Sequence, residues 1–191
     1  MKKTILVILI AVALLVLIFF LVKIAGKGIL PDLMGTTSNT STDVSYLKGE
    51  KLLNKKVPYF DLPSTSLNRV KLKDYTGKPF IIVFWATWNL ESVNQIKILD
   101  EYITSTKKKE QLFSIIAISN QEEESVVKSF MRRGGYDVIV GIDKNGSTGV
   151  DFNIKALPTT IFVDSDGYIR DIYTGVLNNS MLVDKVEPLL K

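Results

Sequence analysis

A short apolar segment that leads directly into an amphipathic helix constrains the fold of this chain more than any other feature. Residues 79–85 form a continuous run rich in Ile, Val and Phe, which is typical of a central strand covered on both faces. After Trp85–Trp88, which reads Trp-Ala-Thr-Trp, apolar side chains recur every three or four residues, at Val93, Ile96, Leu99 and Ile103. The sequence therefore predicts a buried strand followed by a helix over Leu90–Thr106, with Asn89 as a favourable N-cap residue.

Strand-like and helical segments alternate through the rest of the chain. We expect strands over 69–72, 112–119, 138–142, 159–163 and 168–174, and helices over 121–133 and 181–190, the last capped by Asn179 or Ser180. The residues Asp-Ser-Asp-Gly at 164–167 predict a hairpin turn between the last two strands. This order predicts an α/β domain with a mixed central β-sheet and helices on both faces.

The helix expected over 121–133 has a charge order that matches the helix dipole. Glu122, Glu123 and Glu124 fall in its first turn, and two arginines fall in its last. We therefore interpret the three carboxylates as structural rather than catalytic. The pair Gly134-Gly135 is expected to end this helix.

The chain has 191 residues and contains neither cysteine nor histidine. Without a thiol it can form no disulfide, thiolate nucleophile or thiolate metal site. Without an imidazole it has no His general base and no Ser-His-Asp arrangement. The formal net charge of +4 is too small to indicate nucleic-acid binding, so we expect no nucleic-acid partner.

Residues 5–22 form an apolar run without a charge, Gly or Pro, preceded by two lysines. At ~1.5 Å per residue, a helix of this length approaches the roughly 30 Å hydrocarbon core of a bilayer. We therefore expect a transmembrane signal anchor. A cleaved signal peptide is the alternative, with a weak cleavage site at Ala25-Gly26. We expect a single-pass membrane protein with its C-terminal domain outside the cytoplasm, although Lys23 and Lys27 leave only a small charge difference across the anchor.

The chain around this run divides into three further parts. Residues 1–4 are a short basic N-terminal segment, residues 23–56 are a juxtamembrane segment and linker, and residues 57–191 are the domain. Small polar residues at 35–43 predict a flexible tether. The lysine-rich stretch 45–56 is interpreted as a solvated entry to the domain, with contact to anionic lipid headgroups as the alternative.

Five motifs follow one another from Val57 to the end of the chain, at Pro58–Leu62, Leu72–Lys78, Phe84–Trp88, Leu157–Asp164 and Asp166-Gly167. In this order they resemble the thioredoxin superfamily, and within it the membrane-anchored TlpA/ResA-type thiol–disulfide oxidoreductases and related redoxins. The resemblance implies a thioredoxin-like fold. It also implies that a Cys-x-x-Cys pair would occupy the first turn of the helix after Trp88, where this chain has Asn89 and Ser92.

Further departures from the family pattern accompany the missing thiols. The residue before the second cysteine is often proline in relatives and is Glu91 here, and an acidic or amide residue within the preceding strand is Val83 here. The resemblance also implies a cis peptide bond between Leu157 and Pro158. In relatives, the backbone of the residue before that proline pairs with an extended substrate peptide.

We expect a membrane-tethered, redox-inactive domain that binds a protein or peptide through Trp88, Asn89, Leu157 and Pro158. The alternatives are residual or unrecognised oxidoreductase activity and a structural role in a membrane complex. We expect no catalytic residue, metal or cofactor. The segment Asp143–Ile154 resembles a Ca²⁺ loop only superficially, because it lacks the Gly and the Glu that such a loop requires at its sixth and twelfth positions.

Overall fold

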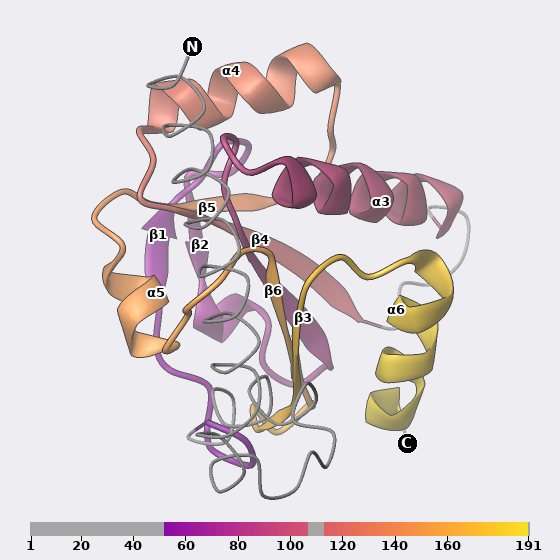
Figure 1. Ribbon diagram of the computed structural model, residues 1–191. Helices are drawn as coiled ribbons and strands as arrows, with labels where there is room; N and C mark the ends of the chain where they lie inside the picture. Colours follow the sequence, from indigo (N-terminus) through magenta and orange to yellow (C-terminus); the bar gives the residue numbers. More distant parts are fainter. Residues whose placement is uncertain (1–51, 107–112, 191) are drawn as a thin grey trace, which may run out of the picture. The chain divides into compact units, whose positions relative to one another are not determined.

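The computed structural model describes residues 52–106 and 113–190, which belong to one compact unit (Figure 1). The expected anchor at residues 5–22 and the expected tether at 35–43 lie outside the described residues. Within the described ranges, no helix is long and apolar enough to cross a membrane.

The centre of the domain is a five-stranded mixed sheet in the order β5-β4-β3-β6-β7. The strands β3, β4 and β5 are parallel to one another, whereas β6 runs antiparallel to β3 and β7 runs antiparallel to β6. The expected mixed sheet is thus confirmed. The strands are β3 (Phe80–Trp85), β4 (Ser114–Asn120), β5 (Val140–Asp143), β6 (Thr159–Val163) and β7 (Ile169–Thr174).

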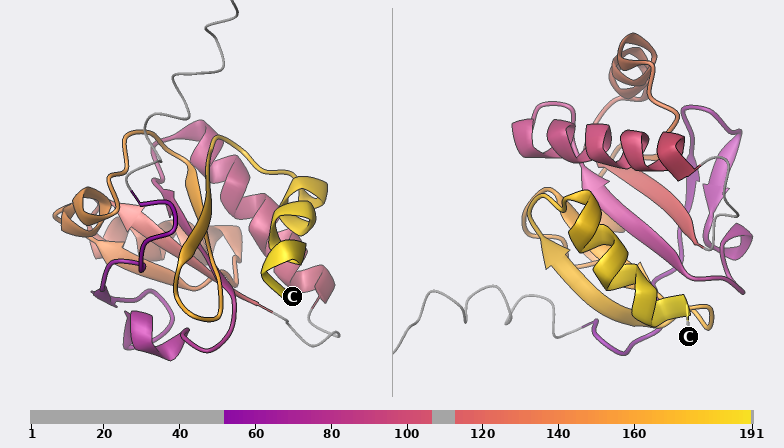
Figure 2. Two further views of the ribbon diagram at one scale, coloured as in Figure 1. Left: turned by 90° about the horizontal axis from the view of Figure 1, so that it is seen from below. Right: turned by 90° about the vertical axis from the view of Figure 1, so that its right-hand side faces the viewer.

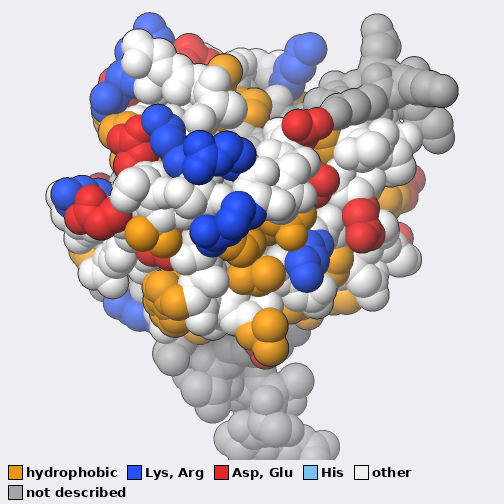
Figure 3. All heavy atoms as spheres, turned by 90° about the horizontal axis from the view of Figure 1, so that it is seen from above, with side chains coloured by type: hydrophobic (Ala, Val, Ile, Leu, Met, Phe, Trp, Pro, Cys, Tyr) orange, Lys and Arg blue, Asp and Glu red, His pale blue; other side chains and the backbone are white. Residues whose placement is uncertain are grey.

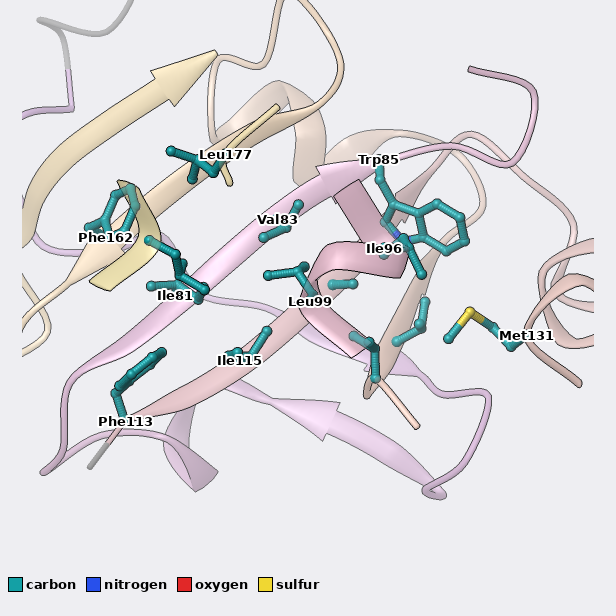
Figure 4. Close-up of a cluster of buried hydrophobic side chains, with 14 of the residues drawn as sticks. Ile81, Val83, Trp85, Ile96, Leu99, Phe113, Ile115, Met131, Phe162 and Leu177 are labelled. Carbon is teal, nitrogen blue, oxygen red and sulfur yellow. The ribbon is translucent and has the colours of Figure 1, made fainter. Parts of the chain in front are cut away.

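Three helices pack on one face of the sheet: α3 (Leu90–Thr106), α4 (Glu124–Gly134) and α6 (Asn179–Val186). Alternate residues of β3 point toward them, and Trp85 lies near Ile96 of α3 and on the same side as Met131 of α4 (Figure 4). Every residue of β3 is buried, as the uninterrupted apolar run predicts.

The opposite face also carries a helix, as expected, but that helix is short and shares the face with a second sheet. A two-stranded antiparallel sheet of β1 (Asp61–Pro63) and β2 (Arg69–Lys71) packs there, together with the five-residue helix α5 (Ser147–Asp151). Phe152, at the end of α5, packs its ring against Phe60 and Phe84. Figure 2 shows α3 and α6 on one side of the central sheet and α5 on the other. The short 3-10 helices are η1 (Leu72–Asp74) and η2 (Glu187–Leu190).

Several predicted boundaries were wrong by a few residues, and two of the errors have clear physical causes. The helix α4 begins at Glu124 rather than at residue 121, because Gln121 adopts a positive φ of 58° and the chain turns before the helix starts. The cap of α6 is Asn178, whose side chain accepts a hydrogen bond from the Met181 N–H, and not Asn179 or Ser180. The end of α4 is as predicted, with Gly135 in the left-handed conformation.

Candidate functional site

The helix α3 begins at the position where the resemblance places the first cysteine. The side-chain oxygen of Asn89 accepts a hydrogen bond from the backbone N–H of Ser92 at 2.8 Å, and the Asn89 carbonyl accepts from the Val93 N–H at 3.0 Å. The side-chain contact satisfies one of the backbone donors that every helix leaves free in its first turn. Asn89 therefore acts as the predicted N-cap.

Ser92, at the position of the second cysteine, is completely buried. It lies on the buried stripe of α3, which consists of Ser92, Gln95, Ile96 and Leu99. Among the described residues, nothing hydrogen-bonds to its hydroxyl oxygen. We predicted an apolar stripe that included Val93 and Ile103, but these two residues are only half-buried. The polar residues Ser92 and Gln95, which we did not predict to face the core, are buried instead.

The buried side chain of Gln95 hydrogen-bonds the helix α3 to the backbone of Leu177. Its side-chain oxygen accepts a hydrogen bond from the Leu177 N–H at 2.6 Å, and its amide nitrogen donates to the Leu177 carbonyl at 3.3 Å. A buried amide that meets both groups of one residue's backbone is well satisfied. The first half of α3 is therefore tied to the connection between β7 and α6.

Two large apolar side chains at the start of α3 remain in solvent. Trp88 is 69% exposed and Leu90 is 84% exposed. Trp88 was predicted as part of the binding surface, whereas no pattern in the sequence singled out Leu90. Together they place apolar surface on both sides of Asn89.

The cis peptide bond between Leu157 and Pro158 is present and lies at the same end of the sheet. The antiparallel register of β3 and β6 ends at the pair Phe84 and Thr159, so Pro158 lies at the end of the sheet where β3 leads into the turn that carries Trp88. The segment before Pro158 and the turn that carries Trp88 thus both adjoin this end of the sheet. Pro158 is buried and Leu157 is half-buried.

The backbone of Leu157 is available for pairing. Its neighbours are engaged, since the Ala156 carbonyl accepts from the Thr159 hydroxyl at 2.8 Å and the Pro158 carbonyl accepts from the Gly175 N–H at 2.9 Å. Within residues 52–106 and 113–190, neither the N–H nor the carbonyl of Leu157 has a hydrogen-bond partner. Such a free pair of groups is what an extended peptide needs for strand addition.

A carboxylate that we did not predict to take part reaches the site from the start of α4. Glu122 accepts a hydrogen bond from the Thr87 backbone N–H at 2.9 Å and a second from the Thr87 hydroxyl. It is buried and lies before α4, so its predicted place in the first turn of that helix was wrong. Three consecutive glutamates in the sequence contain no signal that would single out this one.

The described residues offer little other chemistry at this end of the sheet. Glu91 is exposed in the first turn of α3, and Val83 is fully buried in β3.

Asp143 accepts a hydrogen bond from the Gly149 N–H at 2.8 Å through one carboxylate oxygen, so the segment that resembles a Ca²⁺ loop forms a turn and α5 instead. No cluster of three acidic, Cys or His side chains that could hold a metal ion occurs in the described parts of the chain.

The ionisable groups with clearly displaced pKa values lie elsewhere in the described domain. A hydrogen bond from Arg69 holds the pKa of Asp61 below its ordinary value. Burial raises the pKa of the Tyr75 and Tyr102 phenols. These groups belong to the β1–β2 sheet and the flanks of the core, so they contribute nothing to a reaction near Trp88.

A family model described as the AhpC/TSA family matches residues 53–172, which is more than half of the chain. The chain belongs to the AhpC/TSA family. A thiol-disulfide oxidoreductase ResA from Bacillus thuringiensis subsp. konkukian is 30% identical over 162 residues, or 84% of this chain and 92% of that protein. The thioredoxin-like protein YneN from Bacillus subtilis is 26% identical over 70% of this chain and 78% of its own length.

Solved structures of similar shape confirm the thioredoxin-like fold of this AhpC/TSA family member. A candidate thiol:disulfide interchange protein DsbE from Chlorobium tepidum superposes with a TM-score of 0.65 at 23% identity, covering 73% of this chain and 98% of that one. The exposed lipoprotein thioredoxin Etrx1 from Streptococcus pneumoniae gives a TM-score of 0.62 at 19% identity, covering 69% of this chain and all of that one. This chain without cysteine is thus similar in sequence to proteins named thiol-disulfide oxidoreductases.

Proposed function

We propose that this protein is a membrane-tethered, redox-inactive thioredoxin-like domain that binds a protein or peptide partner through the surface around Trp88 and Pro158. One observation carries the proposal. Trp88 is 69% exposed, the backbone groups of Leu157 have no hydrogen-bond partner among the described residues, and both residues adjoin the end of the sheet where Phe84 pairs with Thr159. An extended peptide would pair with the Leu157 backbone and pack an apolar side chain against Trp88.

The residues at the start of α3 support the redox-inactive part of the proposal. Thiol–disulfide exchange needs a thiolate at a helix N-terminus and a second thiol to resolve the mixed disulfide. Asn89 instead uses its side chain for capping, and no base among residues 52–106 and 113–190 hydrogen-bonds to the buried Ser92 hydroxyl to ionise it. The names of the relatives favour an oxidoreductase as the second candidate function, which an insulin-reduction assay would detect.

Tethering is the part of the proposal that rests on the sequence. The apolar run at residues 5–22 would anchor the chain, and the domain would stand outside the cytoplasm on the polar linker. A protease-accessibility assay on intact cells tests this arrangement. Digestion of the domain in sealed cells is expected, and its protection would contradict the extracytoplasmic location.

Partner recovery from native membranes tests the binding surface. We expect Trp88→Ala and Leu157→Asp each to lower recovery of a crosslinked partner by about tenfold, as for a central interface residue. Tyr59→Ala is the matched control, because Tyr59 is 70% exposed but lies on the segment that leads into β1. Unchanged recovery in both site variants would show that this surface is idle and would favour a structural role through another face.

A further inference from the structure

We infer that Glu122 is the positioning residue of the partner-binding surface, because it fixes the turn that presents Trp88. This inference rests on the function proposed above. Glu122 lies between β4 and α4, whereas Trp88 lies between β3 and α3. Glu122 is not one of the residues expected to contact the partner. Its carboxylate acts through Thr87, the residue immediately before Trp88.

The parallel pairing of β3 and β4 creates the contact. Trp85 at the end of β3 is the register partner of Ser119 near the end of β4, so the chain leaves both strands at the same edge of the sheet. The positive φ of Gln121 and the hydrogen bond from its N–H to the Asp143 carbonyl turn the chain immediately after β4. Glu122 is thereby directed toward the connection that follows β3.

The two hydrogen bonds account for the burial of this carboxylate. Glu122 is 7% exposed, and within residues 52–106 and 113–190 no Lys or Arg forms an ion pair with it. Its neighbours behave differently, since Glu123 pairs with Lys144 and Glu124 pairs with Lys128 at the surface. A carboxylate can be buried without a large cost only where hydrogen-bond donors replace the water molecules that it loses. Thr87 supplies one such donor to each carboxylate oxygen of Glu122.

The direction in which Trp88 points depends on the backbone at Thr87, because few core contacts hold the Trp88 side chain. Trp88 is 69% exposed, so contacts with the core leave it largely unrestrained. The turn that carries it is held at its ends by the hydrogen bond from the Asn89 N–H to the Ala86 carbonyl, at 3.2 Å. Between these ends, the Glu122 carboxylate holds Thr87 through two hydrogen bonds. Trp88 is then the residue of the turn that projects into solvent.

The face that carries α4 also presents apolar surface. Hydrophobic side chains lie exposed there among Lys and Arg side chains (Figure 3). Val126, in the first turn of α4, is about half exposed. By joining Thr87 to the residue that leads into α4, Glu122 fixes the Trp88 turn relative to this helix.

Fluorine NMR of the full-length chain labelled with 5-fluorotryptophan tests the inference without a partner. The chain has two tryptophans, and Trp88→Phe assigns their signals. We expect Glu122→Ala to shift or broaden the Trp88 signal, and Glu122→Gln to restore it, because an amide can accept from the Thr87 N–H and donate to the hydroxyl. Glu123→Ala is the matched control and should leave the Trp88 signal at its wild-type position, since its carboxylate contacts Lys144.

Partner recovery provides the second measurement. The loss of charge-assisted hydrogen bonds predicts a roughly five- to tenfold fall in recovery for Glu122→Ala and little change for Glu122→Gln. If Glu122→Ala fails to fold, Thr87→Val, which removes only the hydroxyl contact, decides the matter and should move the Trp88 signal in the same direction. A Trp88 signal unchanged in a folded Glu122→Ala or in Thr87→Val would overturn the positioning role. A moved signal with unchanged recovery would instead contradict the proposed function.

Discussion

The side chain of Asn89 accepts a hydrogen bond from the backbone N–H of Ser92, over 2.8 Å. The two positions at which the family resemblance places a pair of thiols are therefore joined by a helix-capping contact. Asn89 contributes to the stability of α3, and Ser92 is part of its buried face. The segment that would carry redox chemistry thus serves the fold, and it holds Trp88 and Leu90 in solvent on either side of the cap.

The cap predicts a measurable loss of stability on its removal. We expect Asn89→Ala to lower the free energy of unfolding by about 1 kcal/mol, and Asn89→Asp to retain most of it, because an aspartate can also accept from the Ser92 N–H. Urea denaturation followed by circular dichroism measures the difference. Asn94→Ala, at an exposed position of the same helix, is the control and should be neutral or slightly stabilising. Equal losses in both alanine variants would argue against a capping role.

The buried hydroxyl of Ser92 predicts a stabilising substitution. Because the hydroxyl has no hydrogen-bond partner among the described residues, Ser92→Ala removes a desolvated polar group and should raise the free energy of unfolding by about 1 kcal/mol. Ser105→Ala serves for comparison, since that exposed hydroxyl donates to the Tyr102 carbonyl at 2.8 Å. A destabilised Ser92→Ala would contradict the interpretation of this hydroxyl as a buried group without a hydrogen-bond partner.

Restoring the thiols tests whether the surrounding structure still supports redox chemistry. We expect wild-type protein to give no insulin reduction above background, and the double variant Asn89→Cys with Ser92→Cys to gain it. The first thiol would stand at the N-terminus of α3, where the helix dipole favours a thiolate, and the second would resolve the mixed disulfide. Each single variant should stay inactive, because one thiol cannot complete the cycle. Robust turnover by the wild type would overturn the assignment as redox-inactive.

Acid sensitivity is expected at the hairpin between β6 and β7. Partial burial of Asp164 opposes its ionisation, but hydrogen bonds from the Tyr168 N–H at 2.8 Å and from Arg170 at 2.6 Å outweigh it and hold the pKa of Asp164 below 3.8. A lowered pKa in the folded state stabilises the fold above the unfolded value of about 3.8, and this contribution is lost as the pH falls through the folded pKa.

Denaturation of wild type and Asp164→Asn at several pH values measures this contribution. The difference in unfolding free energy between them should be largest near neutral pH and should shrink toward pH values of about 3. Asp166→Asn removes a carboxylate from the same turn without breaking the Arg170 pair and is the matched control. A difference that grows on acidification would contradict a lowered pKa of Asp164 in the folded state.

The centre of the fold could be predicted because its signals are local. The run of apolar residues in β3, the spacing of apolar residues in α3 and the N-cap at Asn89 each depend on neighbouring residues only. The cis peptide bond before Pro158 was predicted from the family resemblance, since the sequence pattern alone favours the trans form. Sequence reasoning therefore predicted the cap and the cis peptide bond that the candidate site contains.

Features that depend on tertiary contacts could not be predicted in the same way. Which of three consecutive glutamates becomes buried depends on the backbone turn at Gln121 and on the distance to Thr87, which is 35 residues away in the chain. The short helix α5 contains Gly149 and two β-branched residues and has no periodic pattern, so its presence reflects packing of Phe152 against Phe60 and Phe84. The free backbone of Leu157 likewise becomes visible only when the partners of its neighbours are known.

Site-specific photocrosslinking in native membranes tests the central claim most directly. A photoreactive phenylalanine replaces Trp88 in one full-length variant and Tyr59 in the other, at positions of nearly equal exposure, 69% and 70%. The account predicts a discrete crosslinked partner from position 88, absent from position 59 and lost when Leu157→Asp is added. No crosslinked product from position 88, or the same products from both positions, would contradict it.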